Sequence, residues 1–183
     1  LDVTNGTVYF GGEKIEGVSA GVSDWSQLLN TIASKDGWAI YFENMHETYD
    51  LLSDPPRLLH HKGERVTTKI GILAGYIMFA TYIPGSDLCT TEGDSNLYVL
   101  YYLTGTAYKS YVLKAEKTNK PGKVSRATYL GKGLPTSIGL AVTKEGQIKG
   151  FVQSSTGNIQ SIQELDPSAP RSGYTGWKSG EIR

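Results

Sequence analysis

Short apolar segments separated by glycine-containing turns run along most of the chain. Apolar and polar residues alternate within these segments, and two-residue turns such as Ala74-Gly75, Thr104-Gly105 and Glu145-Gly146 separate neighbouring ones. Alternation with a period of two is typical of strands, and two-residue glycine turns join antiparallel strands into hairpins. The 12 tyrosines and 22 glycines, against only two methionines, also favour sheet over helix. The sequence therefore predicts an all-β fold.

The predicted strands share this alternation and follow or precede a turn. They are Thr7–Phe10, Trp38–Phe42, Val66–Leu73, Tyr76–Ile83, Leu97–Leu103, Tyr108–Leu113, Leu134–Thr143, Gln147–Gln153 and Ile159–Leu165. One window departs from the pattern, because Trp25, Leu28 and Ile32 share a face at helical spacing after a capping Asp24. We expect one short amphipathic helix there, near residues 24–34, and an irregular loop over residues 44–62.

A repeated pattern suggests how these strands are grouped. A Gly-x-Val/Ile motif begins at Gly6, Gly75 and Gly146, which divides the chain into units of roughly residues 1–62, 63–120 and 121–183. Repeated four-stranded antiparallel meanders are typical of β-propeller blades, and a closed propeller needs about four to eight of them. The repeat predicts about three blades of a larger propeller, within one domain over residues 1–183. A sandwich of about ten strands is the alternative.

The charge balance limits the classes of partner. Lys and Arg number 18 and Asp and Glu number 18, but residues 1–64 carry ten acids and four bases, and residues 65–183 carry eight acids and 14 bases. A neutral domain does not favour nucleic-acid binding, and no apolar run is long enough to span a membrane. The basic stretch from Lys109 to Lys132, which includes Arg126, is predicted to be a solvated face or a dock for an anionic surface.

The sequence contains few motifs that carry chemistry. It has no Gly-x-Ser-x-Gly elbow and no phosphate-binding glycine loop. His46, His60 and His61 lack the spacing of zinc ligands, and a calcium loop counted from Asp87 lacks its oxygen ligands. We therefore predict no catalytic residue, no metal ligand and no cofactor in this segment. Cys89 is a buried thiol, a free thiol or half of a disulfide to another chain.

Several motifs occur in an order that resembles one known family. They are Gly37-Trp38-Ala39-Ile40-Tyr41-Phe42, Gly63-Glu64-Arg65-Val66, Ile83-Pro84-Gly85-Ser86-Asp87-Leu88-Cys89, Gly93-Asp94-Ser95-Asn96-Leu97, Thr104-Gly105, Ser154-Ser155-Thr156-Gly157 and Gly176-Trp177-Lys178. This succession resembles the C-terminal β-propeller of the PilY family of type IV pilus assembly and tip-associated adhesin proteins. Asn96 departs from the pattern, because the family usually has Trp there. The family's Asp-rich calcium loop has no counterpart in this chain.

The resemblance implies a non-enzymatic role in pilus biogenesis, surface attachment and twitching motility. It implies minor pilins at the pilus tip and a host or abiotic surface as partners, a place on the cell surface or fimbrium after export through the periplasm, and calcium only in the full-length protein. Its structural positions are Gly37, Trp38, Gly63, Glu64, Arg65, Val66, Pro84, Cys89, Gly157 and Trp177. Exposed loops carry recognition in such scaffolds, so the binding candidates are Asp87, Glu92, Asp94, Lys117, Lys120 and Lys123.

Two other functions stay open at this point. A quinoprotein-like propeller oxidoreductase would need a calcium-bound quinone in its central channel. A stand-alone pilus accessory subunit would need no further blades. The chain opens at Leu1 without a leader, so we expect a processed protein or a fragment of a longer one.

Overall fold

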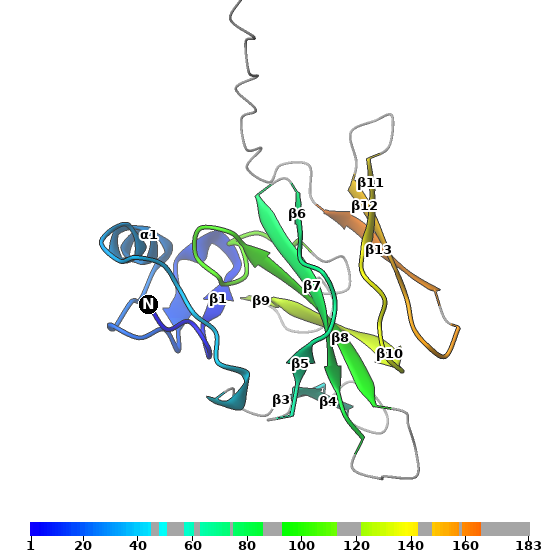
Figure 1. The fold of residues 1–183 in the computed structure, drawn as a ribbon. Coiled ribbons are helices and arrows are strands. Elements are labelled where there is room, and N and C mark those ends of the chain that lie inside the picture. Colours follow the sequence, from blue (N-terminus) through cyan, green and yellow to red (C-terminus); the bar gives the residue numbers. More distant parts are fainter. Residues whose placement is uncertain are drawn as a thin grey trace, which may run out of the picture.

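The chain folds into antiparallel β-sheets and one α-helix, as a computed structural model shows (Figure 1). The structure describes residues 1–44, 48–50, 57–60, 63–73, 75–85, 93–112, 122–142, 148–157 and 159–165. The structure therefore confirms the predicted all-β class.

The elements follow one another along the chain in an order dominated by short strands. They are β1 (Thr7–Tyr9), the 3-10 helix η1 (Phe10–Gly12), β2 (Ile15–Glu16), α1 (Trp25–Ala33), the 3-10 helix η2 (Phe42–Asn44), β3 (Thr48–Asp50), β4 (Arg57–His60), β5 (Arg65–Val66), β6 (Gly71–Leu73), β7 (Tyr76–Ile83), β8 (Asp94–Tyr101), β9 (Lys123–Val124), β10 (Ala127–Lys132), β11 (Gly139–Val142), β12 (Ile148–Gln153) and β13 (Ile159–Leu165).

The central sheet is built on β7 and β8. These two strands of eight residues each pair in unbroken antiparallel register from Tyr76 opposite Tyr101 to Ile83 opposite Asp94. The strand order is β10-β8-β7-β5, and β6 also pairs with the first part of β7. Both strands are buried along nearly their whole length. Burial on both faces explains why β7 and residues 97–101 of β8 are almost continuously apolar instead of alternating.

The two faces of the central sheet contact different parts of the chain. One face, which we call the second face, carries Met78 and Val99. These two side chains share a buried cluster with Leu130 of β10 and Val152 of β12. The three-stranded sheet β11-β12-β13 therefore packs against this side (Figure 1). The opposite face, which we call the first face, carries a buried cluster of Phe79, Tyr98 and Leu100. The partly buried side chains that pack against this cluster are Trp38, Ile40, Phe42, Ile77 and Ala127.

The N-terminal part forms a separate small sheet with the helix beside it. Its strand order is β2-β1-β9, so β9 brings residues 123 and 124 back to the beginning of the chain. The predicted helix is confirmed: the Asp24 side chain accepts a hydrogen bond from Gln27 N at 2.9 Å, which caps α1, and Leu28 is fully buried. Trp25 and Leu28 join the hydrophobic cluster of this sheet.

Three predicted strands are wrong or broken. The Trp38–Phe42 segment makes only a single bridge, Asp2 to Ala39, because its side chains pack on the first face of the central sheet. Val66–Leu73 is split into β5 and β6. Residues 108–112 form no strand, because the Tyr108 ring packs between Trp25, Tyr76 and Tyr101 instead.

Two further differences concern the grouping of strands. Part of the segment predicted as an irregular loop forms the antiparallel pair β3-β4. The described strands make sheets of three, five, three and two strands, and none of these sheets closes on itself. The described residues therefore show stacked antiparallel sheets without repeated four-stranded blades.

Gly105 allows the Trp38 ring to lie close to the turn at residues 104 and 105. Its φ is +66°, and a Cβ added there would lie 2.3 Å from Cδ2 of Trp38. The Trp38 indole N–H donates to the Tyr102 carbonyl at 2.9 Å, which holds the ring over this turn. Only glycine satisfies both the left-handed backbone and the close approach of the ring.

We expect Gly105→Ala to destabilise the protein more than Gly157→Ala. Gly157 has φ +87° but no atom within 4 Å of an added Cβ, so alanine there costs about 1–2 kcal/mol of backbone strain alone. At Gly105 the same strain is joined by overpacking against Trp38, about 1–3 kcal/mol more. Urea unfolding monitored by tryptophan fluorescence measures both, and equal losses for the two variants would contradict the packing argument.

Candidate functional site

A buried carboxylate lies on the first face of the central sheet. Glu64 precedes β5 and is 4% exposed. Its Oε1 accepts hydrogen bonds from the Thr81 hydroxyl of β7 and from the Asn96 amide of β8 at 3.2 Å, and its Oε2 accepts one from the Tyr98 hydroxyl at 3.2 Å. Three donors from two adjacent strands therefore converge on one side chain.

Arg126 supplies positive charge to the same region. Its guanidinium donates to the Val3 carbonyl at 3.0 Å and to the Thr4 carbonyl, which attaches the N-terminal segment to the turn before β10. Its charge favours the ionised forms of Glu64 and Tyr98. We call Glu64, Thr81, Asn96, Tyr98 and Arg126 the buried polar cluster.

The electrostatics of this cluster are dominated by loss of solvent. Burial raises the pKa of Glu64 above its usual 4.5, although its three donors and Arg126 act in the opposite direction. Burial also raises the pKa of Tyr98 well above 10.0, helped by the nearby Glu64 carboxylate, and lowers the pKa of Arg126. The cluster holds an ionisable group at a desolvation cost and connects three segments that are distant in sequence.

This cluster was not predicted from the sequence. The family resemblance predicts only a structural role for Glu64, and the basic stretch that includes Arg126 is predicted to be a solvated face or a dock for an anionic surface. The signal that could have revealed it is the polar pair Thr81 and Asn96, which lie opposite each other at buried positions of the two central strands. Polar side chains at buried strand positions require hydrogen-bond partners, but nothing local indicates which ones.

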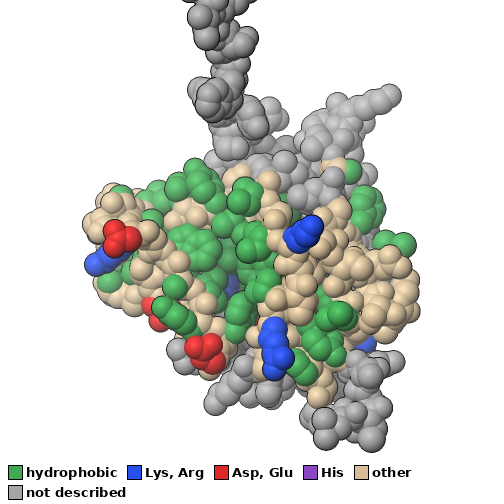
Figure 2. Space-filling model, viewed as in Figure 1, with side chains coloured by type: hydrophobic (Ala, Val, Ile, Leu, Met, Phe, Trp, Pro, Cys, Tyr) green, Lys and Arg blue, Asp and Glu red, His purple; other side chains and the backbone are tan. Residues whose placement is uncertain are grey.

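Beside the cluster, hydrophobic side chains remain partly open to solvent. Ile72 of β6 pairs with Ile77 of β7 and is 70% exposed, and Tyr102 is 44% exposed. Figure 2 shows hydrophobic side chains gathered between α1 and the central sheet. We call this surface the apolar face, and its residues are Trp38, Ile40, Phe42, Ile72, Ile77 and Tyr102.

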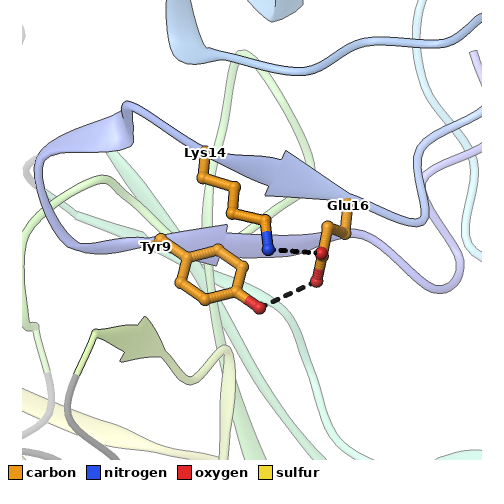
Figure 3. A network of polar contacts seen from close by, with 3 residues as sticks. All are labelled: Tyr9, Lys14 and Glu16. Atoms are coloured by element: carbon orange, nitrogen blue, oxygen red, sulfur yellow. Dashed lines mark hydrogen bonds and ion pairs between the residues drawn. The ribbon is translucent and has the colours of Figure 1, made fainter.

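A second polar group lies on the surface of the N-terminal sheet (Figure 3). The Tyr9 hydroxyl donates to Glu16 at 2.8 Å, and the Lys14 ammonium pairs with the other Glu16 oxygen at 2.6 Å. The ammonium groups of Lys14 and Lys123 lie 4.7 Å and 5.7 Å from the centre of the Tyr9 ring. Lys14 and Tyr9 lower the pKa of Glu16, as hydrogen bonds to a carboxylate do.

The structure separates the two predicted binding residues that it describes. Asp94 begins β8 and accepts a hydrogen bond from the Tyr129 hydroxyl at 2.8 Å, whereas Lys123 lies in β9 of the other sheet. Pro84 follows β7 on the exposed side, and Gly37 directly precedes Trp38. Asp87, Glu92, Lys117, Lys120, Cys89 and Trp177 lie outside the described residues, as do His46 and His61.

The described part of the chain contains no candidate metal site and no candidate membrane-spanning helix. No three or more His, Cys, Asp or Glu side chains of the described part are placed to hold a metal ion together. No helix in the same part has the length and hydrophobicity needed to cross a bilayer.

The chain was compared with protein-family models, with curated proteins and with solved structures, and it matches none of them.

We expect Glu64→Gln to change how stability depends on pH. Because the pKa of Glu64 is raised above 4.5, the folded protein binds more protons than the unfolded chain between pH 4.5 and the folded pKa. The wild type therefore loses stability relative to Glu64→Gln as the pH rises through this window. Urea unfolding of both proteins at a series of pH values measures the difference.

Glu16→Gln is the matched control, because the pKa of Glu16 is lowered and the sign is reversed. The wild type should gain stability relative to Glu16→Gln as the pH rises from below the folded pKa of Glu16 to 4.5. The same pH dependence for both variants would refute the assignment of Glu64 as a desolvated carboxylate.

We expect Arg126→Met to destabilise the protein by about 2–4 kcal/mol, since two backbone carbonyls lose a charged donor. Lys123 is exposed and begins β9, the strand just before the same turn. Lys123→Met should therefore cost about 0.5 kcal/mol or less. Chemical unfolding compares the two. Equal, small losses would show that Arg126 is a surface residue in solution.

Proposed function

We propose that this chain is a non-enzymatic module of a type IV pilus biogenesis and tip-associated adhesin protein, which supports pilus assembly, surface attachment and twitching motility. The observation that supports it best is the convergence of the resembling motifs on one place. Trp38, Glu64 and Gly105 come from three different motifs, and all lie at the first face of the central sheet. In this proposal the motif residues maintain the scaffold, and the exposed segments carry recognition.

The face-to-face packing of two sheets supports a propeller-like scaffold in this proposal. Blades of a propeller stack face to face, and the central sheet has another sheet packed against its second face through Val152 and Leu130. The chain would supply about three such blades of a larger ring. Recognition would then lie in the segments of residues 43–64, 84–96 and 114–133, apart from their strands and from the buried Glu64.

The proposed partners and location follow from the same role. Minor pilins at the pilus tip would bind one side of the module, and a host or abiotic surface the other. The protein would be exported through the periplasm to the cell surface or fimbrium. Calcium would bind elsewhere in the full-length protein.

We expect an in-frame deletion of these 183 residues from the chromosomal gene to reduce surface pili, twitching and attachment. The cause would be loss of the module that connects the pilus tip to its partners. Electron microscopy of piliation, a subsurface twitching assay and adhesion counts measure the three effects.

Complementation with the wild-type gene is the positive control, and complementation with Glu16→Gln, a surface change outside the proposed recognition segments, should also restore all three. Unchanged piliation, twitching and attachment in the deletion strain would refute the proposal.

A further inference from the structure

We propose that the side chains of Thr81 and Asn96 join in an intramolecular ester cross-link, with Glu64 as the base. The Thr81 hydroxyl oxygen attacks the side-chain amide carbon of Asn96, and ammonia leaves. The reaction occurs once in each chain and needs no other substrate. The inference is independent of the pilus role proposed above. It rests on the arrangement of a hydroxyl, a carboxylate and an amide inside the buried polar cluster.

One carboxylate oxygen connects the two reacting groups. Oε1 of Glu64 accepts hydrogen bonds from the Thr81 hydroxyl and from the Asn96 amide nitrogen, the latter at 3.2 Å. The same hydroxyl lies 3.4 Å from the backbone carbonyl oxygen of Asn96. Tyr98 donates to the other carboxylate oxygen at 3.2 Å and so holds the carboxylate in this orientation. A hydroxyl that is bonded to a base, which a third group orients, is the arrangement of an activated nucleophile.

The register of β7 and β8 brings the two side chains within reach of a bond. Thr81 lies directly opposite Asn96 in the unbroken antiparallel pair, and opposite residues of such a pair have Cα atoms about 4.5–5.5 Å apart. Disulfides span Cα separations of this size. The ester has as many bonds between its two Cβ atoms as a disulfide has, so it can connect the strands at this position.

In the reaction, Glu64 transfers one proton from oxygen to nitrogen. It takes the hydroxyl proton as the new bond forms between Thr81 Oγ1 and Asn96 Cγ. It then gives this proton to Nδ2 as the bond between Cγ and Nδ2 breaks, and ammonia leaves with the carboxylate restored. Burial raises the pKa of Glu64 above 4.5, which brings it closer to the value that suits a base at neutral pH.

The surroundings of the reacting groups favour the product. Thr81 and Asn96 are 0% exposed, and Glu64 is 4% exposed. Exclusion of water protects a reactive intermediate, and the ester formed from it, against hydrolysis. Arg126 adds positive charge near the same carboxylate, which favours the negative charge that develops during the attack.

The ester would fix the register of the central sheet covalently. It closes residues 81–96 into a ring, which leaves fewer conformations to the unfolded chain and so stabilises the folded state. The chain contains one cysteine and therefore cannot form a disulfide within itself.

Mass spectrometry of the purified, denatured chain tests the cross-link. We expect the wild type to weigh less than its sequence by the mass of one ammonia molecule. Thr81→Val removes the nucleophile and should have the full mass. Thr104→Val is the matched control, because Thr104 is also 0% exposed but its hydroxyl bonds to that of Thr106 at 2.9 Å. This control should keep the loss of ammonia.

A second measurement locates the bond. Glu92 lies between Thr81 and Asn96 in the sequence, so cleavage after Glu92 in denaturant gives two separate peptides unless their side chains are joined. We expect a joined pair in the wild type, which hydroxylamine separates because it cleaves esters. If ammonia is instead lost from Asn5-Gly6 by succinimide formation, the two peptides stay separate, and the proposal is overturned.

Glu64→Gln tests the base. We expect the loss of ammonia, followed over time after cell-free synthesis, to slow about a hundredfold or more, which is the contribution of a general base. Tyr98→Phe removes only the group that orients the carboxylate and should slow it less. Circular dichroism checks that each variant is folded.

The outcomes are distinct. A wild type with the full mass of its sequence overturns the proposal, and so does a loss of ammonia that Thr81→Val retains. Conversion at the wild-type rate in folded Glu64→Gln overturns the role of Glu64 as the base. A loss that is absent in Thr81→Val, kept in Thr104→Val and located across Glu92 supports the cross-link.

Discussion

The register between β7 and β8 is the constraint on which the other contacts depend. The pairing runs over eight residues without a bulge, so each side chain is assigned to one face by its position alone. Met78 and Val99 are thereby directed to the β11-β12-β13 sheet, and Phe79 and Tyr98 to the N-terminal segment. A slip of one residue would exchange the two faces and bury different groups on each side.

The buried polar cluster shows what this register makes possible and what it costs. Thr81 and Asn96 lie opposite each other, so both can donate to Glu64 from adjacent strands. Burying a carboxylate opposes folding unless its partners compensate, and the raised pKa of Glu64 shows that the donors and Arg126 compensate only in part. In return, Arg126 connects residues 3 and 4 to a turn more than 120 positions later. The cluster thus specifies how the N-terminal segment lies against the central sheet.

Elements whose signal is local were predicted well. β7 and β13 begin and end where the flanking turns indicated, and α1 lies within the predicted window because Asp24 and the spacing of Trp25 and Leu28 are local features. The strand expected after the Thr104-Gly105 turn failed because the Tyr108 ring packs between two hydrophobic clusters. β9 could not be foreseen, since its partner β1 lies over one hundred residues earlier.

The amino-acid sequence by itself determined the antiparallel, sheet-rich class, the helix and the positions of most turns, because each of these depends on periodicity and backbone preference over a few residues. Only the tertiary structure decided that Arg126 leaves a basic stretch to bind two carbonyls, that Glu64 is buried among three donors, and that Trp38 lies over Gly105. These contacts join segments that are distant along the chain, and a hydrogen bond or ring contact of that kind leaves no pattern in either segment alone.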